Sequence, residues 1–220
     1  MNKLNVLYED NHIIVVEKEA NILSQKDDTN DPDLLSLVKE YIKEKYNKSG
    51  EAYIGLVHRL DRPVSGVMVF ARTSKAASRL SKQIQDGTFH KNYYAVVHGI
   101  LDKKEDELID KITKLNDNSS VIDKNGKLAK LKYKVIEENK ELDLSLVDID
   151  LETGRHHQIR VQFANISHPL YGDQRYGLQD KKQIALHSYK VSFVHPTTKE
   201  IMTFILPPKS NDIWKNFKSI

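Results

Sequence analysis

The sequence predicts an α+β fold with a mixed, mostly antiparallel sheet and flanking helices. Short apolar or alternating segments, typical of strands, outnumber the segments with helical spacing, and short polar turns join many of them. This pattern favours strands that pair with their neighbours along the chain. The length of 220 residues fits a single domain, residues 1–220, made of two intimately packed halves.

Strands are predicted where β-branched and aromatic residues cluster or alternate with polar ones. In 142–151 the apolar residues change parity midway, which predicts a β-bulge there. The predicted strands are 5–8, 12–16, 67–71, 91–98, 130–135, 142–151, 189–194 and 201–206.

Three segments show the apolar spacing of a helix. The first is 32–46, with Asp31 as the N-cap and proline at the first helical position. The second begins after Thr73 or Ser74 and ends before Gly87. The third is a short helix around 159–166.

Composition narrows the functional classes. The chain has no cysteine, which excludes a disulfide framework, a thiol nucleophile and a cysteine-type zinc site. No apolar run approaches the roughly 20 residues that span a bilayer, and the N-terminus lacks the apolar core of a signal peptide. We therefore expect a cytoplasmic protein with no membrane partner.

The net charge of +3 is unevenly distributed. Residues 58–100 carry +5 and residues 151–190 carry +3, whereas most of the remaining chain is acidic. Localised positive charge is typical of a surface that binds a polyanion. Two solvated basic faces would give the same count.

The densest charged motif is His58–Arg62, in which Asp61 lies among Arg59, Arg62 and His58. Adjacent cations favour an ionised aspartate, which can act as a nucleophile or base. In an extended segment Arg59 and Asp61 point to the same side and can share a pocket. A surface turn of salt bridges is the alternative interpretation.

A second motif combines a glycine turn with the predicted third helix. Arg155, His156, His157 and Arg160 follow Gly154 and offer donors for an anionic group. Neighbouring residues on a helix diverge by about 100°, so the two histidines are poorly placed to share a metal, and no metal site is predicted.

A third motif places Tyr93 and Tyr94 in a predicted strand, where they face opposite sides. One tyrosine can pack in the core while the other stacks on a nucleobase; core packing of both is the alternative.

Taken in order, these blocks resemble the RluA-type family of RNA pseudouridine synthases. The resemblance covers about residues 5–208 and is carried by His58–Asp61 with Ser65-Gly66, Lys91–Tyr93, Thr153–Arg160, His168-Pro169, Gly172-Asp173, Tyr176-Gly177, Leu186-His187 and Phe193–Pro196.

The resemblance implies a role for four residues. Asp61 matches the catalytic aspartate, and Arg59 the arginine that helps displace the target base. Tyr93 matches the tyrosine that stacks on the uracil, and Arg160 the basic residue that pairs with the aspartate. Four further candidates come from the same motifs: His58, Arg62, Arg155 and Gln158.

The resemblance also implies the reaction and the fold. Uridine in structured ribosomal or transfer RNA is isomerised to pseudouridine without a cofactor or metal. The fold is a mixed, bent sheet with helices on its two halves and a central cleft. The chain is expected to be a monomer of the short form, without an S4 domain.

The sequence departs from the family pattern at a few positions. Lys18–Asn21 stands where Lys-Pro-Ala-Gly is usual, Val64 and His156 replace threonine, and Gln162 replaces a common histidine. These changes bear on loop geometry and RNA preference.

Two other functions fit parts of the pattern. A non-catalytic RNA-binding or RNA-folding module would need the same basic segments, but it would not need Asp61. A hydrolase acting on a nucleoside or glycoside would pair two carboxylates, and the motifs offer no clear partner for Asp61.

Overall fold

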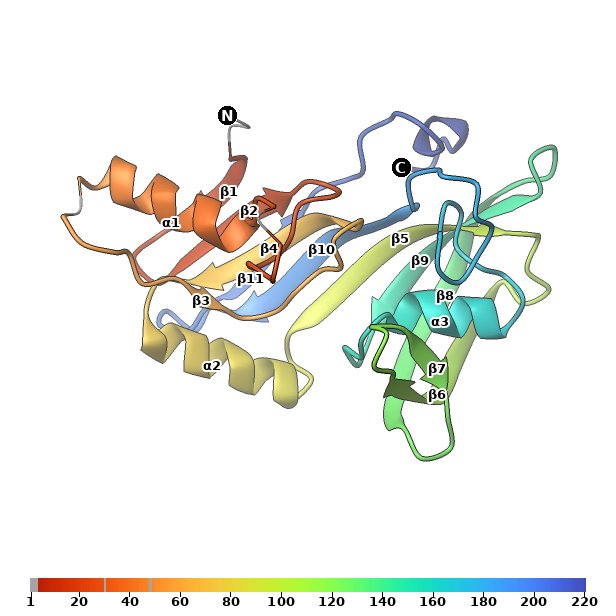
Figure 1. Cartoon of the computed structure of the whole chain (residues 1–220), viewed down its shortest axis with the longest axis horizontal. Helices are drawn as coiled ribbons and strands as arrows, with labels where there is room; N and C mark the ends of the chain where they lie inside the picture. Colours follow the sequence, from red (N-terminus) through yellow and green to blue (C-terminus); the bar gives the residue numbers. More distant parts are fainter. Residues whose placement is uncertain (1–3, 30, 48) are drawn as a thin grey trace. The chain divides into compact units, whose positions relative to one another are not determined.

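The computed structural model describes residues 4–29, 31–47 and 49–220, shown as a ribbon in Figure 1. Its helices are α1 (Leu34–Lys45), α2 (Ser74–Gln85) and α3 (Gln158–Asn165), with a 3-10 turn at Trp214–Asn216. The strands are β1 (Val6–Glu9), β2 (Ile13–Lys18), β3 (Gly55–Leu56), β4 (Ser65–Ala71), β5 (His90–His98), β6 (Glu105–Lys114), β7 (Ser120–Ile122), β8 (Lys127–Asn139), β9 (Leu144–Leu151), β10 (Leu186–Val194) and β11 (Ile201–Ile205).

The predicted α+β class with a mostly antiparallel sheet is confirmed. Among the described residues, no helix has the length and apolar character needed to cross a membrane.

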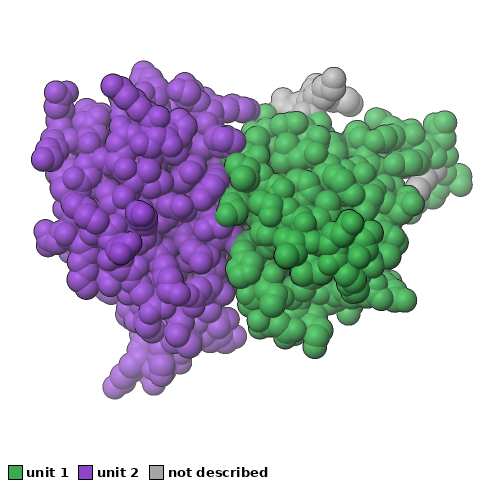
Figure 2. All heavy atoms as spheres, turned by 180° about the vertical axis from the view of Figure 1, so that it is seen from behind, with its two compact units in different colours: residues 1–90, 190–206 green, residues 91–189, 207–220 purple. Residues whose placement is uncertain are grey.

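The chain divides into two compact units, coloured separately in Figure 2. Unit 1 comprises Met1–His90 and Lys190–Leu206, and unit 2 comprises Lys91–Tyr189 and Pro207–Ile220. The expectation that 1–220 acts as one domain of two packed halves stays a prediction.

In unit 1 the strand order is β1-β2-β4-β10, with β3 beside β4 and β11 beside β10. The alternating residues of β2 and β4 are buried on both faces of the sheet. Figure 1 shows why, because α1 and α2 lie on opposite sides of these strands. On the α2 side the core contains Ile13, Val15, Val67, Val69, Ala76, Leu80, Val191 and Phe193.

The first helix begins later than the sequence predicted. Its N-cap is Asp33, whose side chain accepts a hydrogen bond from the Ser36 amide at 3.0 Å, so the helix starts at Leu34. Asp31 forms an ion pair with Arg62 at 2.7 Å instead. Either aspartate is a suitable cap residue, but backbone hydrogen bonds between Leu23 and the segment around Asp33 hold the chain extended up to Asp33.

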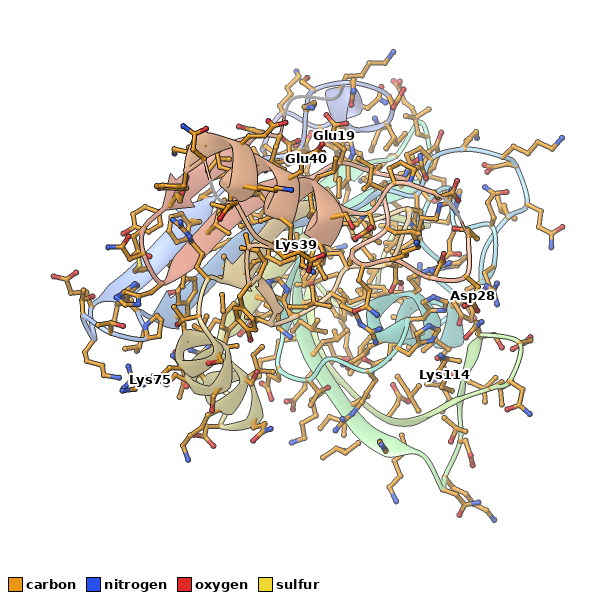
Figure 3. The ribbon with its side chains drawn as sticks, turned by 60° about the vertical axis from the view of Figure 1, so that its left-hand side comes forward. Glu19, Asp28, Lys39, Glu40, Lys75 and Lys114 are labelled. Atoms are coloured by element: carbon orange, nitrogen blue, oxygen red, sulfur yellow. The ribbon has the colours of Figure 1, made fainter. Side chains whose placement is uncertain are left out.

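The second helix agrees with its prediction. Thr73 is the N-cap and accepts a hydrogen bond from the Ala76 amide at 3.1 Å. Ala76 and Leu80 are buried, whereas Lys75 points away from the helix into solvent (Figure 3).

In unit 2 the strand order is β10-β5-β9-β8-β6-β7. The pairs β5–β9, β9–β8, β8–β6 and β6–β7 are antiparallel. Helix α3 packs on this sheet, with the ring of Phe163 5.4 Å from that of Tyr133. The segment around the 3-10 turn places Ile213 and Phe217 against Val96 and Leu146.

The predicted bulge exists, but the extra residue lies on the partner strand. Val135 of β8 is opposite Val147, and Glu137 is opposite Leu146, so Ile136 is the additional residue. Strand β9 itself pairs with β5 without interruption.

The change of parity in β9 has a different cause. Its first residues, 144–147, are buried on both faces, because Leu144 and Leu146 contact the C-terminal segment while Val147 faces the other side. Leu142 lies outside the strand and is 47% exposed.

Candidate active site

The segment that carries Asp61 is irregular, but its backbone is held firmly. It connects the short strand β3 to β4. The Ser24 hydroxyl donates to the Leu60 carbonyl at 2.6 Å and accepts from the Leu60 amide at 3.1 Å. Beyond Asp61, the Val64 amide donates to the Asp61 carbonyl at 3.0 Å, which closes a tight turn. Half-buried Asp61 therefore projects from a fixed backbone.

A buried lysine supports the same turn from β2. Lys18 is fully buried, and its ammonium donates to the carbonyls of Glu19, Arg62 and Val64 at 3.2, 3.0 and 2.7 Å. Only the charged form has three N–H groups for these acceptors. Burial lowers the pKa of Lys18 to about 7, although the nearby Asp61 carboxylate raises it.

The block Lys18–Asn21 is hydrogen-bonded to the turn that carries Asp61. Asn21 has φ +68°, in the left-handed region where the family usually has glycine, and asparagine tolerates this conformation better than most residues. Its amide donates to the Arg62 carbonyl at 2.8 Å. The loop therefore still joins the turn that carries Asp61.

Three neighbours of Asp61 have distinct environments. The Nε2 atom of His58 accepts a hydrogen bond from the Val69 amide at 3.0 Å, so His58 ties the segment to β4. Arg59 is exposed. Arg62 is exposed and pairs with Asp31. Both arginines are exposed enough to contact a substrate, and Arg62 already pairs with a carboxylate of this chain.

The two tyrosines of β5 face opposite sides, as predicted. Tyr94 stacks on Tyr189 with ring centroids 3.8 Å apart, and the Tyr189 hydroxyl donates to Asp148 at 3.1 Å. Tyr93 lies opposite Ile149 and is only 5% exposed.

The glycine turn before α3 is organised by Gln158. Its side-chain oxygen accepts from the Thr153 hydroxyl at 2.8 Å and the Arg155 amide at 3.0 Å, and its nitrogen donates to the Lys130 carbonyl at 3.0 Å. Arg155 is exposed, and its Nε donates to the Leu128 carbonyl at 2.8 Å. Gln158 is thus a structural residue of the turn.

The adjacent histidines stack on each other. Their ring centroids are 3.8 Å apart, and the Ser120 hydroxyl lies 3.0 Å from Nδ1 of His156, while Nδ1 of His157 lies 2.8 Å from the Tyr176 hydroxyl. In the described part of the chain, no group of three or more histidine or acidic side chains is arranged to hold a metal ion.

Arg160 is anchored by the carboxylate of Asp173, a residue of the Gly172-Asp173 block to which the sequence assigned no role. Its Nε and Nη2 donate to Asp173 Oδ2 and Oδ1, each at 2.8 Å, and Asp173 is fully buried. The Arg160 guanidinium also lies 5.2 Å from the ring centroid of Tyr176. Although burial raises the pKa of Asp173, the hydrogen bonds and charge of Arg160 hold it below its usual value.

The sequence offers only weak signals for the contacts that Lys18, Ser24 and Asp173 make. Lys18 shares strand parity with Ile14 and Val16, which was a clue to its burial. Ser24 and Asp173 lie in polar or turn-rich segments without periodicity.

Arg59 and Asp61 belong to unit 1, whereas Tyr93 and Arg160 belong to unit 2. Their assembly into one cleft stays a prediction.

Comparison with known proteins identifies the family. A family model described as RNA pseudouridylate synthase matches residues 12–165. The chain belongs to the RNA pseudouridylate synthase family. It is therefore an enzyme that isomerises uridine in RNA.

Relatives and solved structures agree with this assignment. The chain is 35% identical over 210 residues to an uncharacterized RNA pseudouridine synthase of Bacillus subtilis, covering 93% of this chain and 68% of that protein. It is 32% identical to ribosomal large subunit pseudouridine synthase C of Buchnera aphidicola, covering 92% and 67%. The structure of human RNA pseudouridylate synthase domain containing 4 shares the fold, with a TM-score of 0.78 and 19% identity, covering 93% and 89%.

Proposed function

We propose that this synthase converts uridine in large-subunit ribosomal RNA to pseudouridine with Asp61 as the catalytic carboxylate. The observation that carries the assignment is the restrained backbone around Asp61, fixed by Ser24 before it and by Lys18 after it. A reacting group held by its surroundings needs little reorganisation in the transition state.

The reaction breaks the bond between uracil N1 and C1′ and forms a bond between C5 and C1′. Asp61 acts as a carboxylate, either by attacking C1′ or by removing the 2′ proton to give a glycal. In both routes the C5 proton is lost and N1 gains a proton, so the product is an isomer. We expect no cofactor or metal to be required.

The substrate assignment is supported by the names of relatives. Two of them are ribosomal large subunit pseudouridine synthases C and D. Flipping the target base from a stem costs a few kcal/mol, and Arg59 and Tyr93 would offset this cost by filling the vacated space and stacking on the uracil. The Asp173-anchored Arg160 would orient Asp61.

The test uses unmodified large-subunit ribosomal RNA and transfer RNA, incubated separately with the protein and mapped for pseudouridine. We expect modification of the ribosomal RNA by wild type and none by Asp61→Asn. The matched control is Asp31→Asn, which removes a nearby exposed carboxylate and should leave the rate unchanged. Modification of transfer RNA alone would overturn the substrate assignment, and an active Asp61→Asn variant would overturn the catalytic one.

A further inference from the structure

Lys91, the second residue of β5, is a buried lysine. It is only 7% exposed, yet within residues 4–29, 31–47 and 49–220 its ammonium has neither a hydrogen bond nor an ion pair. Burial lowers the pKa of Lys91. Burying an unpaired charge is costly, so this position works against folding stability.

The surroundings of Lys91 leave room for its ammonium. A Cβ atom placed on Gly154 would lie 3.3 Å from Lys91 Nζ, closer than most real contacts of a Cβ. Gly154 belongs to the turn that Gln158 organises through Thr153 and the Arg155 amide. The ammonium therefore lies beside a well-ordered turn in unit 2.

Lys91 also shares a strand face with Tyr93. The two residues are separated by one position on β5, so their side chains project from the same face about 6.8 Å apart along the strand. Tyr94 projects from the other face, where Tyr189 covers it. A phosphate bound to Lys91 would therefore belong to the nucleotide stacked on Tyr93 or to one next to it.

An apolar side chain could fill this space without the cost of desolvating a charge. A buried cation in such a position indicates a functional site and calls for an anionic ligand. Lysine binds phosphate as a point charge, and the substrate of this enzyme is a polyanion.

We propose that Lys91 binds a backbone phosphate of the RNA, next to the nucleotide whose base stacks on Tyr93. This inference rests on the proposed function, because it takes the position of the target base from the role proposed for Tyr93. The Lys91 ammonium would then pair with a phosphate when the RNA is bound. Lys91 is then a substrate-positioning residue in addition to the four predicted ones.

The first experiment compares Lys91→Met with wild type, and Lys134→Met serves as a control at an exposed lysine of β8. Binding of a ribosomal RNA fragment that wild type modifies is measured over a range of salt concentrations. We expect Lys91→Met to weaken binding about tenfold or more. The slope of log affinity against log salt should fall by about 0.7–0.9, as for one lost phosphate contact. Lys134→Met should change neither value.

The thermal stability of Lys91→Met distinguishes a role in RNA binding from a structural role. Lys91→Met should unfold at the same or a higher temperature than wild type, because an unpaired buried charge is removed. Reduced stability together with unchanged RNA affinity would show that Lys91 is a structural residue and would overturn the proposal.

A methylphosphonate at one position of the RNA removes one phosphate charge. Scanning the phosphates on either side of the target uridine should reveal one at which wild type loses affinity and Lys91→Met does not. Equal losses for both proteins at every position would overturn the proposal. If wild type modifies no RNA, the proposed function fails instead; if wild type is active and Lys91→Met matches it, only this inference fails.

Discussion

The ion pair between Arg160 and Asp173 gives the sharpest test of how unit 2 holds the Arg160 side chain. Replacing Asp173 with asparagine removes the negative charge while nearly preserving the shape. The Arg175 and Tyr176 amides, which donate to Asp173 Oδ1 at 2.9 and 3.2 Å, can keep an acceptor in this variant. The main loss is then the negative charge that pairs with the Arg160 guanidinium through two hydrogen bonds.

The expected magnitude follows from burial. The side chain of Asp173 is fully buried and that of Arg160 is 8% exposed, with two hydrogen bonds of 2.8 Å between them. Removing one partner of such a pair costs about 3–5 kcal/mol, because the other charge stays buried. For a protein of this size, each kcal/mol corresponds to about 2–4 °C in Tm, so the expected decrease is about 6–20 °C.

Urea and thermal unfolding of Asp173→Asn at neutral pH measure this cost. The matched control is Glu152→Gln, which breaks the ion pair of Glu152 with Lys132 at 2.8 Å. Both of these side chains reach solvent, so we expect a far smaller change. An Asp173→Asn variant as stable as Glu152→Gln would refute the argument.

The pH dependence gives an independent check. The pKa of Asp173 is lowered in the folded protein, so the unfolded state binds the proton more readily. The stabilisation is therefore present above the ordinary aspartate pKa and is lost as pH falls through the lowered value. The stability difference between wild type and Asp173→Asn should shrink under strongly acidic conditions. A difference that grows with acidity would contradict the assigned sign.

Three further predictions concern unit 1. Ser24→Ala should lower the free energy of unfolding by about 1–3 kcal/mol and slow pseudouridine formation, because the backbone amide and carbonyl of Leu60 both lose the Ser24 hydroxyl. Urea unfolding identical to that of wild type would contradict this prediction. Lys18→Met should lower the free energy of unfolding, and the stability difference between wild type and this variant should grow as pH rises above about 7. The pKa of Lys18 is lowered in the folded state, so the unfolded state binds more protons in this pH range. Equal pH profiles of stability for the two proteins would exclude this linkage. Asp33→Ala should lower the free energy of unfolding by about 1 kcal/mol because the N-cap of α1 is lost, whereas Asp31→Ala should have a smaller effect. A larger loss of thermal stability in Asp31→Ala would instead support Asp31 as the N-cap.

Local pattern was sufficient for most of the elements in this protein. The alternation in 130–135 is reproduced in β8, where Leu131 and Tyr133 are buried and Lys132 and Lys134 are exposed. The helical spacing after Thr73 is reproduced in α2. Such periodicities can be identified within one short segment, because side chains at a fixed interval along a strand or a helix lie on the face that packs against the core.

Strands β3, β6 and β7 were not predicted, and two further errors arose where two local solutions were nearly equivalent. Asp31 and Asp33 both suit an N-cap, and the backbone pairing of Leu23 with the segment around Asp33 distinguishes them. In β9 the parity change was interpreted as a bulge within the strand. The C-terminal segment buries Leu144 and Leu146 from the other face, and the extra residue is Ile136 of β8.

The sequence by itself determined the fold class and the family, and it predicted the motif residues of the site, with Asp61 foremost. Tertiary structure alone decided burial and partners: the three carbonyls that bind Lys18, the carboxylate of Asp173 that anchors Arg160, and the burial of Lys91. The physical reason is that burial and hydrogen bonding depend on groups far apart in the chain. The hydrophobic periodicity of a segment predicts which face of a helix or strand is apolar, but it does not predict which distant atoms contact that face.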